Sequence, residues 1–222
     1  MKSLSSRMRD YETAGGRVLP GRIPAIVTIR GRNLADCMDK DVTEAMERTA
    51  ILVSREIPDF QLGYTALGDA CFMFRSDWYS GNIACISSVV SSLFSLYFNK
   101  IYCGRLGRAP FDVFYGNAFI IGDDDIANYF VWKQGECIDR SVMRHARKVF
   151  FKDDIGGMRV KELQRLLHDS GNSWDLLDGR TKYGSFIVKN GVVTNSRENY
   201  WTLSHYLGIH LLPSDTSDTS DE

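Results

Sequence analysis

The chain has 222 residues, of which 44% are hydrophobic, and its formal net charge is −1. A chain of this length and composition can bury a sizeable core, which excludes a wholly disordered protein and predicts one globular α/β body with an extension. Its five cysteines show no C-x-x-C spacing and its four histidines show no zinc-ligand pattern. We therefore expect reduced thiols, no structural zinc and a cytoplasmic location.

Charge is distributed unevenly along the chain. Residues 1–32 hold seven Lys or Arg against two acids, whereas the last ten residues, PSDTSDTSDE, hold four acids. Without those four acids the body carries +3, and a basic surface of this kind favours a polyanionic partner. We expect the acidic tail over residues 213–222 to be disordered, because it has nothing to bury.

No segment indicates a membrane or secretion. The N-terminal sequence MKSLSSRMRDYE lacks the apolar segment of a signal peptide. The longest apolar run, residues 84–98, is short for a bilayer span and rich in serine. The sequence therefore predicts a protein without membrane association.

The first predicted strand lies within residues 23–34, after a short helix predicted over residues 3–13. Its apolar and β-branched residues follow Pro24, which is tolerated at the start of a strand, and the strand ends at the turn residue Gly31. A strand that ends in a glycine turn before a helix can present backbone N–H groups to an anion. We therefore predict a nucleotide-binding site at Arg30, Gly31, Arg32, Asn33 and Leu34.

A helix, a hairpin, a second helix and another strand follow. Apolar residues at a period of 3.6 predict the first helix over residues 42–57. Residues 61–74 predict a hairpin that turns around Gly68 and lies beside the first strand. The second helix is predicted over residues 80–98, and its serines at a spacing of four should let it pack closely on a neighbouring backbone. The strand that follows should end near residue 121.

The C-terminal half begins with a long helix over about residues 126–151. Basic residues recur on one face of this helix, and such a ridge suits the phosphate backbone of RNA, although a solvated helix face has the same composition. The predicted RNA-binding residues are Lys133, Arg140, Arg144, Arg147 and Lys148. A helix over residues 160–168, a hairpin over residues 185–194 and an amphipathic segment over residues 200–212 complete the body.

Several segments, read in order, resemble the tRNA(His) guanylyltransferase family. They are SRMRDYE (6–12), LPGRIPAIVTIRGR (19–32), EAMERTA (44–50), LGYTALGDACFMF (62–74), YFN (97–99), PFD (110–112), NYFVWKQ (128–134) and ELQRLLHDSGNSW followed by YGSFIVK. The resemblance implies an α/β (α+β) fold with a palm-like antiparallel sheet covered by helices. This sheet would be related to the polymerase palm, with a small C-terminal helix and hairpin extension.

On this basis we expect a palm domain over residues 1–155, a small C-terminal region over residues 156–212 packed on it, and the tail over residues 213–222. For an active member, the resemblance implies Mg²⁺ and GTP or ATP as cofactors and tRNA as the RNA partner. It also implies a homo-oligomer, either a dimer or a tetramer.

The chain departs from the family at the two positions that carry its chemistry. The family holds two Mg²⁺ ions with one acid at the end of the first strand and one in the hairpin. Here Arg30 stands at the first position, and an ungapped alignment puts Gly68 at the second, followed by Asp69. Arginine has no lone pair to offer a metal. We therefore assign no catalytic residue and expect no cofactor; if the chain is active, Asp69 and Asp112 are the alternative catalytic residues and Asp69 the alternative metal ligand.

Three functions remain open on the sequence. The first is a catalytically degenerate protein that binds RNA, a nucleotide triphosphate or both, with Arg30 and Arg32 supplying positive charge. The second is an active nucleotidyltransferase that adds nucleotides to a tRNA 5′ end through a rearranged metal site. The third is a structural or host-interaction protein that keeps only the fold. Arg30 could also simply pair with Asp69 across neighbouring strands, filling the former site with a salt bridge.

Overall fold

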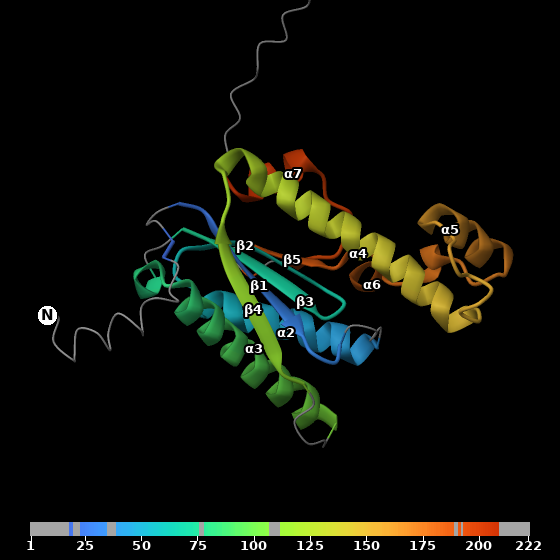
Figure 1. Cartoon of the computed structure of the whole chain (residues 1–222), viewed down its shortest axis with the longest axis horizontal. Coiled ribbons are helices and arrows are strands. Elements are labelled where there is room, and N and C mark those ends of the chain that lie inside the picture. The colour runs from blue at the N-terminus through green and yellow to red at the C-terminus, as the bar shows by residue number, and fades with distance from the viewer. Residues whose placement is uncertain are drawn as a thin grey trace, which may run out of the picture.

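The computed structural model describes residues 18–19, 23–34, 39–75, 78–106, 112–188, 191 and 193–208. The helix predicted over residues 3–13 and the acidic tail over residues 213–222 lie outside this part of the chain. Figure 1 shows the described part as a twisted sheet crossed by long helices.

Six antiparallel strands form the sheet, in the order β4-β1-β3-β2-β5-β6. They are β1 (Ala25–Gly31), β2 (Phe60–Ala66), β3 (Asp69–Phe74), β4 (Phe114–Ile120), β5 (Ser185–Val188) and β6 (Val193–Thr194). The predicted hairpin is confirmed, because β2 and β3 are joined by the turn Leu67-Gly68 and β1 pairs with β3. The predicted palm-like antiparallel sheet is therefore present.

The predicted helices of the described chain lie close to their predicted positions, and one short helix, over Gly179–Tyr183, was not predicted. The helices are α2 (Lys40–Glu56), α3 (Ile83–Leu106), α4 (Ile126–Val149), α5 (Val160–Asp169), α6 (Gly179–Tyr183) and α7 (Tyr200–Tyr206), with short 3₁₀ turns η1 (Trp78–Gly81), η2 (Asp123–Asp125) and η3 (Trp174–Leu176). α2 begins where the side chain of Asp39 accepts a hydrogen bond from the N–H of Asp41. α3 continues about two turns beyond its predicted end at residue 98, to Leu106.

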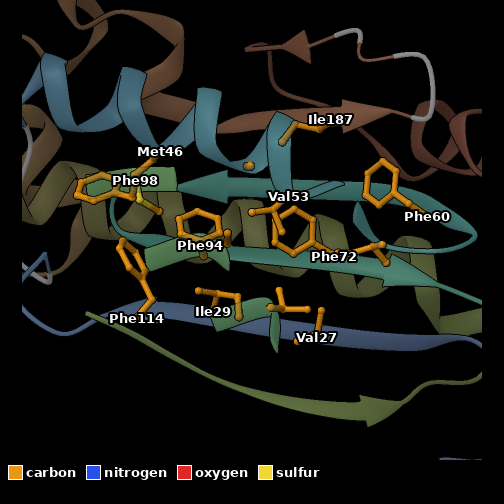
Figure 2. Close-up of a cluster of buried hydrophobic side chains, with 14 of the residues drawn as sticks. Val27, Ile29, Met46, Val53, Phe60, Phe72, Phe94, Phe98, Phe114 and Ile187 are labelled. Carbon is orange, nitrogen blue, oxygen red and sulfur yellow. The ribbon is translucent and has the colours of Figure 1, made fainter. Parts of the chain in front are cut away.

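One face of the sheet packs against α2 and α3. Because successive strand residues point to opposite faces, Val27, Ile29 and Phe72 all reach this side, where Figure 2 shows them around Phe94 of α3. The ring of Phe94 lies 6.2 Å from that of Phe72 and 4.7 Å from that of Phe114, measured between centroids. These aromatic contacts fix α3 across β3 and β4.

The serines of α3 bring it close to the backbone of β4, as predicted. Ser95 Oγ accepts a hydrogen bond of 3.0 Å from the N–H of Phe114. A Cβ at Gly116 would lie 2.9 Å from Ser91 Oγ and 2.6 Å from the carbonyl oxygen of Thr28. Gly116 therefore permits the close approach of the helix to the strand.

By length and composition alone, one helix of the described chain could cross a membrane, namely α3 over Ile83–Gly104. Its buried side chains, which include Ile86, Val90 and Phe98, belong to the core beside the sheet and α2. A core helix passes the same test, so this finding is a weak indication of a membrane span.

The opposite face of the sheet is covered in part by α4 and α7. Ile26, Tyr64 and Cys71 reach this face and form a second apolar cluster with Phe130 of α4 and Leu203 of α7. Figure 1 shows α4 continuing past the sheet to α5, where a third cluster around Trp174 and Leu167 holds the far end of the helix. α4 therefore joins the sheet to this small lobe.

The C-terminal region is joined to the palm more closely than the division at residue 155 predicted. β5 pairs with β2 and β6 pairs with β5, so the predicted C-terminal hairpin extends the main sheet. The polar turn residue Asn190 lies outside the described residues. Residues 185–194 thus contribute strands to the palm itself.

A buried carboxylate ties this C-terminal region to α2. Glu47 accepts two hydrogen bonds of 2.9 Å from Arg180, one of 2.6 Å from Ser185 Oγ and one of 3.0 Å from Asn195 Nδ2. Burial alone would raise the pKa of Glu47, but the hydrogen bonds from its partners outweigh burial and the pKa is lowered. The charged form of Glu47 therefore stabilises the fold.

We expect Glu47→Gln to lower the free energy of unfolding by about 3 kcal/mol, because it leaves Arg180 without its anion. Glu56→Gln, which changes an exposed residue at the end of the same helix that accepts a hydrogen bond from the Tyr97 hydroxyl, should cost less than about 1 kcal/mol. The pKa of Glu47 is lowered in the folded state, so its contribution is complete above the unfolded-state pKa of about 4.3 and is lost as pH falls through the folded-state value. Chemical denaturation between pH 3 and 7 measures the free energy of unfolding of the wild type and both variants. If both variants lost the same free energy of unfolding, the stabilising role of Glu47 would be contradicted.

Candidate functional site

The face of the sheet that α4 covers only in part contains a cavity of about 260 Å³. Its apolar floor includes Ala66, Ala70 and Cys71, and burial raises the pKa of the Cys71 thiol to about 12. Its polar lining comes from four strands and a helix, namely Thr28, Arg30, Tyr64, Asp69, Tyr115, Asn117, Lys133 and Arg140. An apolar floor with a few converging polar groups is typical of a small-ligand site.

Asp69 lies at the centre of the charged groups in this cavity. β1 and β3 pair with Arg30 directly opposite Asp69, so both side chains reach the same face. Arg30 Nε donates to Asp69 Oδ1 at 3.2 Å, and Arg140 Nη1 of α4 donates to Asp69 Oδ2 at 2.7 Å. One carboxylate thus joins two arginines from different parts of the chain.

Positive charge exceeds negative charge at this site. The described lining residues include three cations, Arg30, Lys133 and Arg140, against Asp69. Asp69 is the main cause of the raised pKa of Arg30, which therefore stays protonated. Lys133 donates to Glu136 at 3.1 Å and lies 4.5 Å above the ring of Trp132, at the margin of the cavity.

The backbone donors of the Gly31 turn are used within the protein, contrary to the predicted phosphate cradle. The N–H of Gly31 donates to the carbonyl oxygen of Gly68, that of Arg32 to Val113, and that of Asn33 to the carboxylate of Asp112. Leu34 is fully buried in the core. The acceptors of these N–H groups come from distant segments of the chain. Of the five residues predicted to bind a nucleotide, only the exposed Arg30, Arg32 and Asn33 therefore have a side chain that a ligand could contact.

Asp112 supports this turn and does not join Asp69. Its side chain is 4% exposed and accepts hydrogen bonds from the N–H groups of Asn33 and Val113. It is also not among the described residues that line the cavity. The alternative pair of Asp69 and Asp112 is therefore not assembled in one site.

The predicted basic ridge of α4 divides into two parts. Lys133 and Arg140 face the cavity, and Arg144 is half-buried one turn further along. Arg147 and Lys148 are exposed near the end of the helix. Only the last two therefore lie on an open surface of the kind that the RNA prediction assumed.

The cavity does not fit a pair of Mg²⁺ ions. Two-metal chemistry needs several oxygen ligands, and among the described residues no three acids, histidines or cysteines gather in a group that could hold a metal. Asp69 has one arginine at each of its oxygens. Moreover, Gly68 has a φ of +143°, and a Cβ there would lie 2.7 Å from Leu34 Cβ, so an aspartate at this position would not fit without a shift of the backbone.

Tyr115 and Asn117 were not predicted as site residues. Both lie on β4 at the positions opposite Arg30 and Thr28, and alternation along the strand places them on the cavity face. Tyr115 is 56% exposed at the edge of the sheet. This alternation is a signal that sequence reasoning could have used once β4 was paired with β1.

The antiparallel sheet and its partly open face define a palm-like fold of the nucleotidyltransferase class. No family model and no curated protein matches the sequence. Several solved structures share the fold. A bacterial tRNA(His) guanylyltransferase-like protein in complex with ATP has 26% identity and a TM-score of 0.84, over 92% of this chain and 97% of that one.

Two further structures support the fold. A bacterial guanylyltransferase-like protein in complex with GTP has 23% identity and a TM-score of 0.73 over the same shares of both chains. The tRNA(His) guanylyltransferase of Saccharomyces cerevisiae has 15% identity and a TM-score of 0.71, over 83% of this chain and 92% of that one. The resemblance read from the motifs is thus confirmed, and the chain has a tRNA(His) guanylyltransferase-like structure.

We expect Gly68→Ala to lower the free energy of unfolding by about 2 kcal/mol or more, because the new Cβ meets Leu34 and the backbone is left-handed. Gly122→Ala is the matched control, since Gly122 has a φ of −68° and nothing lies within 4 Å of an added Cβ. It should change stability by less than about 0.5 kcal/mol. If urea denaturation gave the same midpoint for both variants, Leu34 would not fill this position.

Proposed function

We propose that this chain is a catalytically degenerate guanylyltransferase-like protein that binds the phosphates of a nucleotide or of RNA without two-metal transfer. The observation that carries the proposal is the position of Arg30. It stands where the family has a metal-binding aspartate, and it pairs with Asp69 inside the cavity.

The chemistry of the lining residues supports binding by protein cations in place of metal ions. Mg²⁺ takes oxygen ligands, whereas a guanidinium offers only donors and repels a divalent cation. Donors of this type bind phosphate oxygens directly, often with two hydrogen bonds from one arginine. Arg30, Lys133 and Arg140 could therefore neutralise phosphate charge that the family neutralises with metals.

The comparisons make phosphate-bearing ligands the natural candidates. Similar structures were determined in complex with ATP and with GTP, and another is an enzyme of tRNA(His). The exposed Arg147 and Lys148 extend positive charge along α4 away from the cavity. On this proposal a single RNA strand would reach from the cavity along α4, and the assembled protein would be a homo-oligomer, as the family resemblance implies.

Binding of GTP, ATP and tRNA, each measured with Mg²⁺ and with EDTA, tests the proposal. We expect binding of at least one ligand to persist in EDTA. Arg140→Gln should weaken it by about 10- to 100-fold, because a charge-assisted hydrogen bond to phosphate is lost. Arg48→Gln, an exposed residue of α2 whose salt bridge lies outside the cavity, should leave affinity unchanged.

Two outcomes would contradict the proposal. If the protein lengthens a 5′-monophosphorylated tRNA in the presence of Mg²⁺, ATP and GTP, the chain is an active nucleotidyltransferase with a rearranged site around Asp69. If it binds none of the three ligands in EDTA and extends no RNA, the chain is a structural or host-interaction protein. Enzyme-stoichiometric concentrations make the extension assay sensitive to a single turnover.

A further inference from the structure

We infer that the ligand group held in this cavity is a dianionic phosphomonoester, which takes the place of the Asp69 carboxylate between Arg30 and Arg140. The inference rests on the proposed function and makes it more specific. On this inference Asp69 competes with the phosphate for the two arginines and so sets the affinity of the site. The sequence had suggested a different role for Asp69, that of a metal ligand.

The geometry of Asp69 is that of a bound anion. Its two oxygens accept one hydrogen bond each, from Arg30 Nε at 3.2 Å and from Arg140 Nη1 at 2.7 Å. A terminal phosphoryl group offers three oxygens and about two negative charges at pH 7, so it can accept from the same donors and satisfy more of them. The side chain of Arg30 is 55% exposed and that of Arg140 is 30% exposed, so both can be reached from solvent.

One donor at this site has no acceptor. The Nε of Arg140 is buried and makes no hydrogen bond to any described residue. Buried hydrogen-bond donors usually have an acceptor. A donor without one, on a residue that lines a cavity, indicates that a ligand could supply the acceptor. A phosphoryl group between the two arginines would bring an additional oxygen to the same guanidinium.

The balance of charge favours a dianion over a single negative charge. When a ligand takes the place of Asp69 between Arg30 and Arg140, these two arginines present two positive charges to it. The third lining cation, Lys133, is already paired with Glu136. A phosphomonoester matches the two charges of the arginines, whereas a phosphodiester carries only about one charge.

The cavity is small, so it would enclose the phosphate of a nucleotide and leave the rest of the nucleotide at its rim. A volume of about 260 Å³ lies slightly below the range of about 300–1,000 Å³ that small-ligand sites occupy. The exposed ring of Tyr115 stands beside Arg30 at the edge of the sheet and offers a surface for a ribose or a base. The same monoester chemistry occurs in a free nucleoside monophosphate and at an RNA 5′ end.

Titration calorimetry in EDTA tests this with guanosine monophosphate, guanosine, and short RNAs with a 5′-phosphate or a 5′-hydroxyl. We expect Asp69→Asn to bind the monophosphate about 10-fold more tightly than the wild type, because it removes a competing anion from two arginines. Asp139→Asn, an exposed residue on another face of α4, should leave affinity unchanged. A preference for the 5′-phosphorylated RNA over the monophosphate would identify an RNA end as the source.

Unchanged or weaker binding by the Asp69 variant would overturn the inference. A second measurement uses the wild-type protein alone, and so does not depend on the folding of a variant. The methyl ester of guanosine monophosphate, a monoanion, should bind at least about 10-fold more weakly than the monophosphate. Equal affinities for the monophosphate and its methyl ester would overturn the inference, but binding in EDTA would still support the proposed function. If no phosphate ligand bound at all, both the inference and the proposed function would be overturned.

Discussion

The cavity depends on the contact of one carboxylate, Asp69, with two arginines. The register of β1 and β3 places Arg30 opposite Asp69, and α4 brings Arg140 to the other oxygen of the same group. Each arginine alone would make a partly exposed ion pair of modest strength. Together they connect the hairpin, the first strand and the long helix at the cavity on this face of the sheet. The charge of the site follows from this arrangement, and so does the ligand preference that we propose.

The rest of the fold holds these elements in place. Phe94 and the serines of α3 fix this helix against β3 and β4, while the contacts of Glu47 tie α2 to the segment that ends in β5. Leu34 fills the space above Gly68 and leaves no room for a side chain there. The apolar packing of a palm is therefore intact on both sides of the sheet and supports the charged groups of the open face.

Much of this structure could be predicted from the sequence. The turn at Gly68, the strand before Gly31 and the helix that follows were visible as local patterns, and the family motifs set their arrangement. The contact of Arg30 with Asp69 was one of the open alternatives, because it needs only the pairing of two strands. The approach of Arg140 was not predicted, since it depends on where α4 crosses the sheet. The donors of the Gly31 turn were misjudged because their acceptors, such as Asp112, lie far away in the sequence.

A crystal structure of the protein with guanosine monophosphate and Mn²⁺ tests the central claim most directly. Mn²⁺ can replace Mg²⁺ at oxygen ligands and is visible by its anomalous scattering. The account predicts a phosphoryl group between Arg30 and Arg140, a displaced Asp69 side chain and no anomalous peak in the cavity. An Mn²⁺ ion bound to Asp69, with Arg30 turned away, would contradict it.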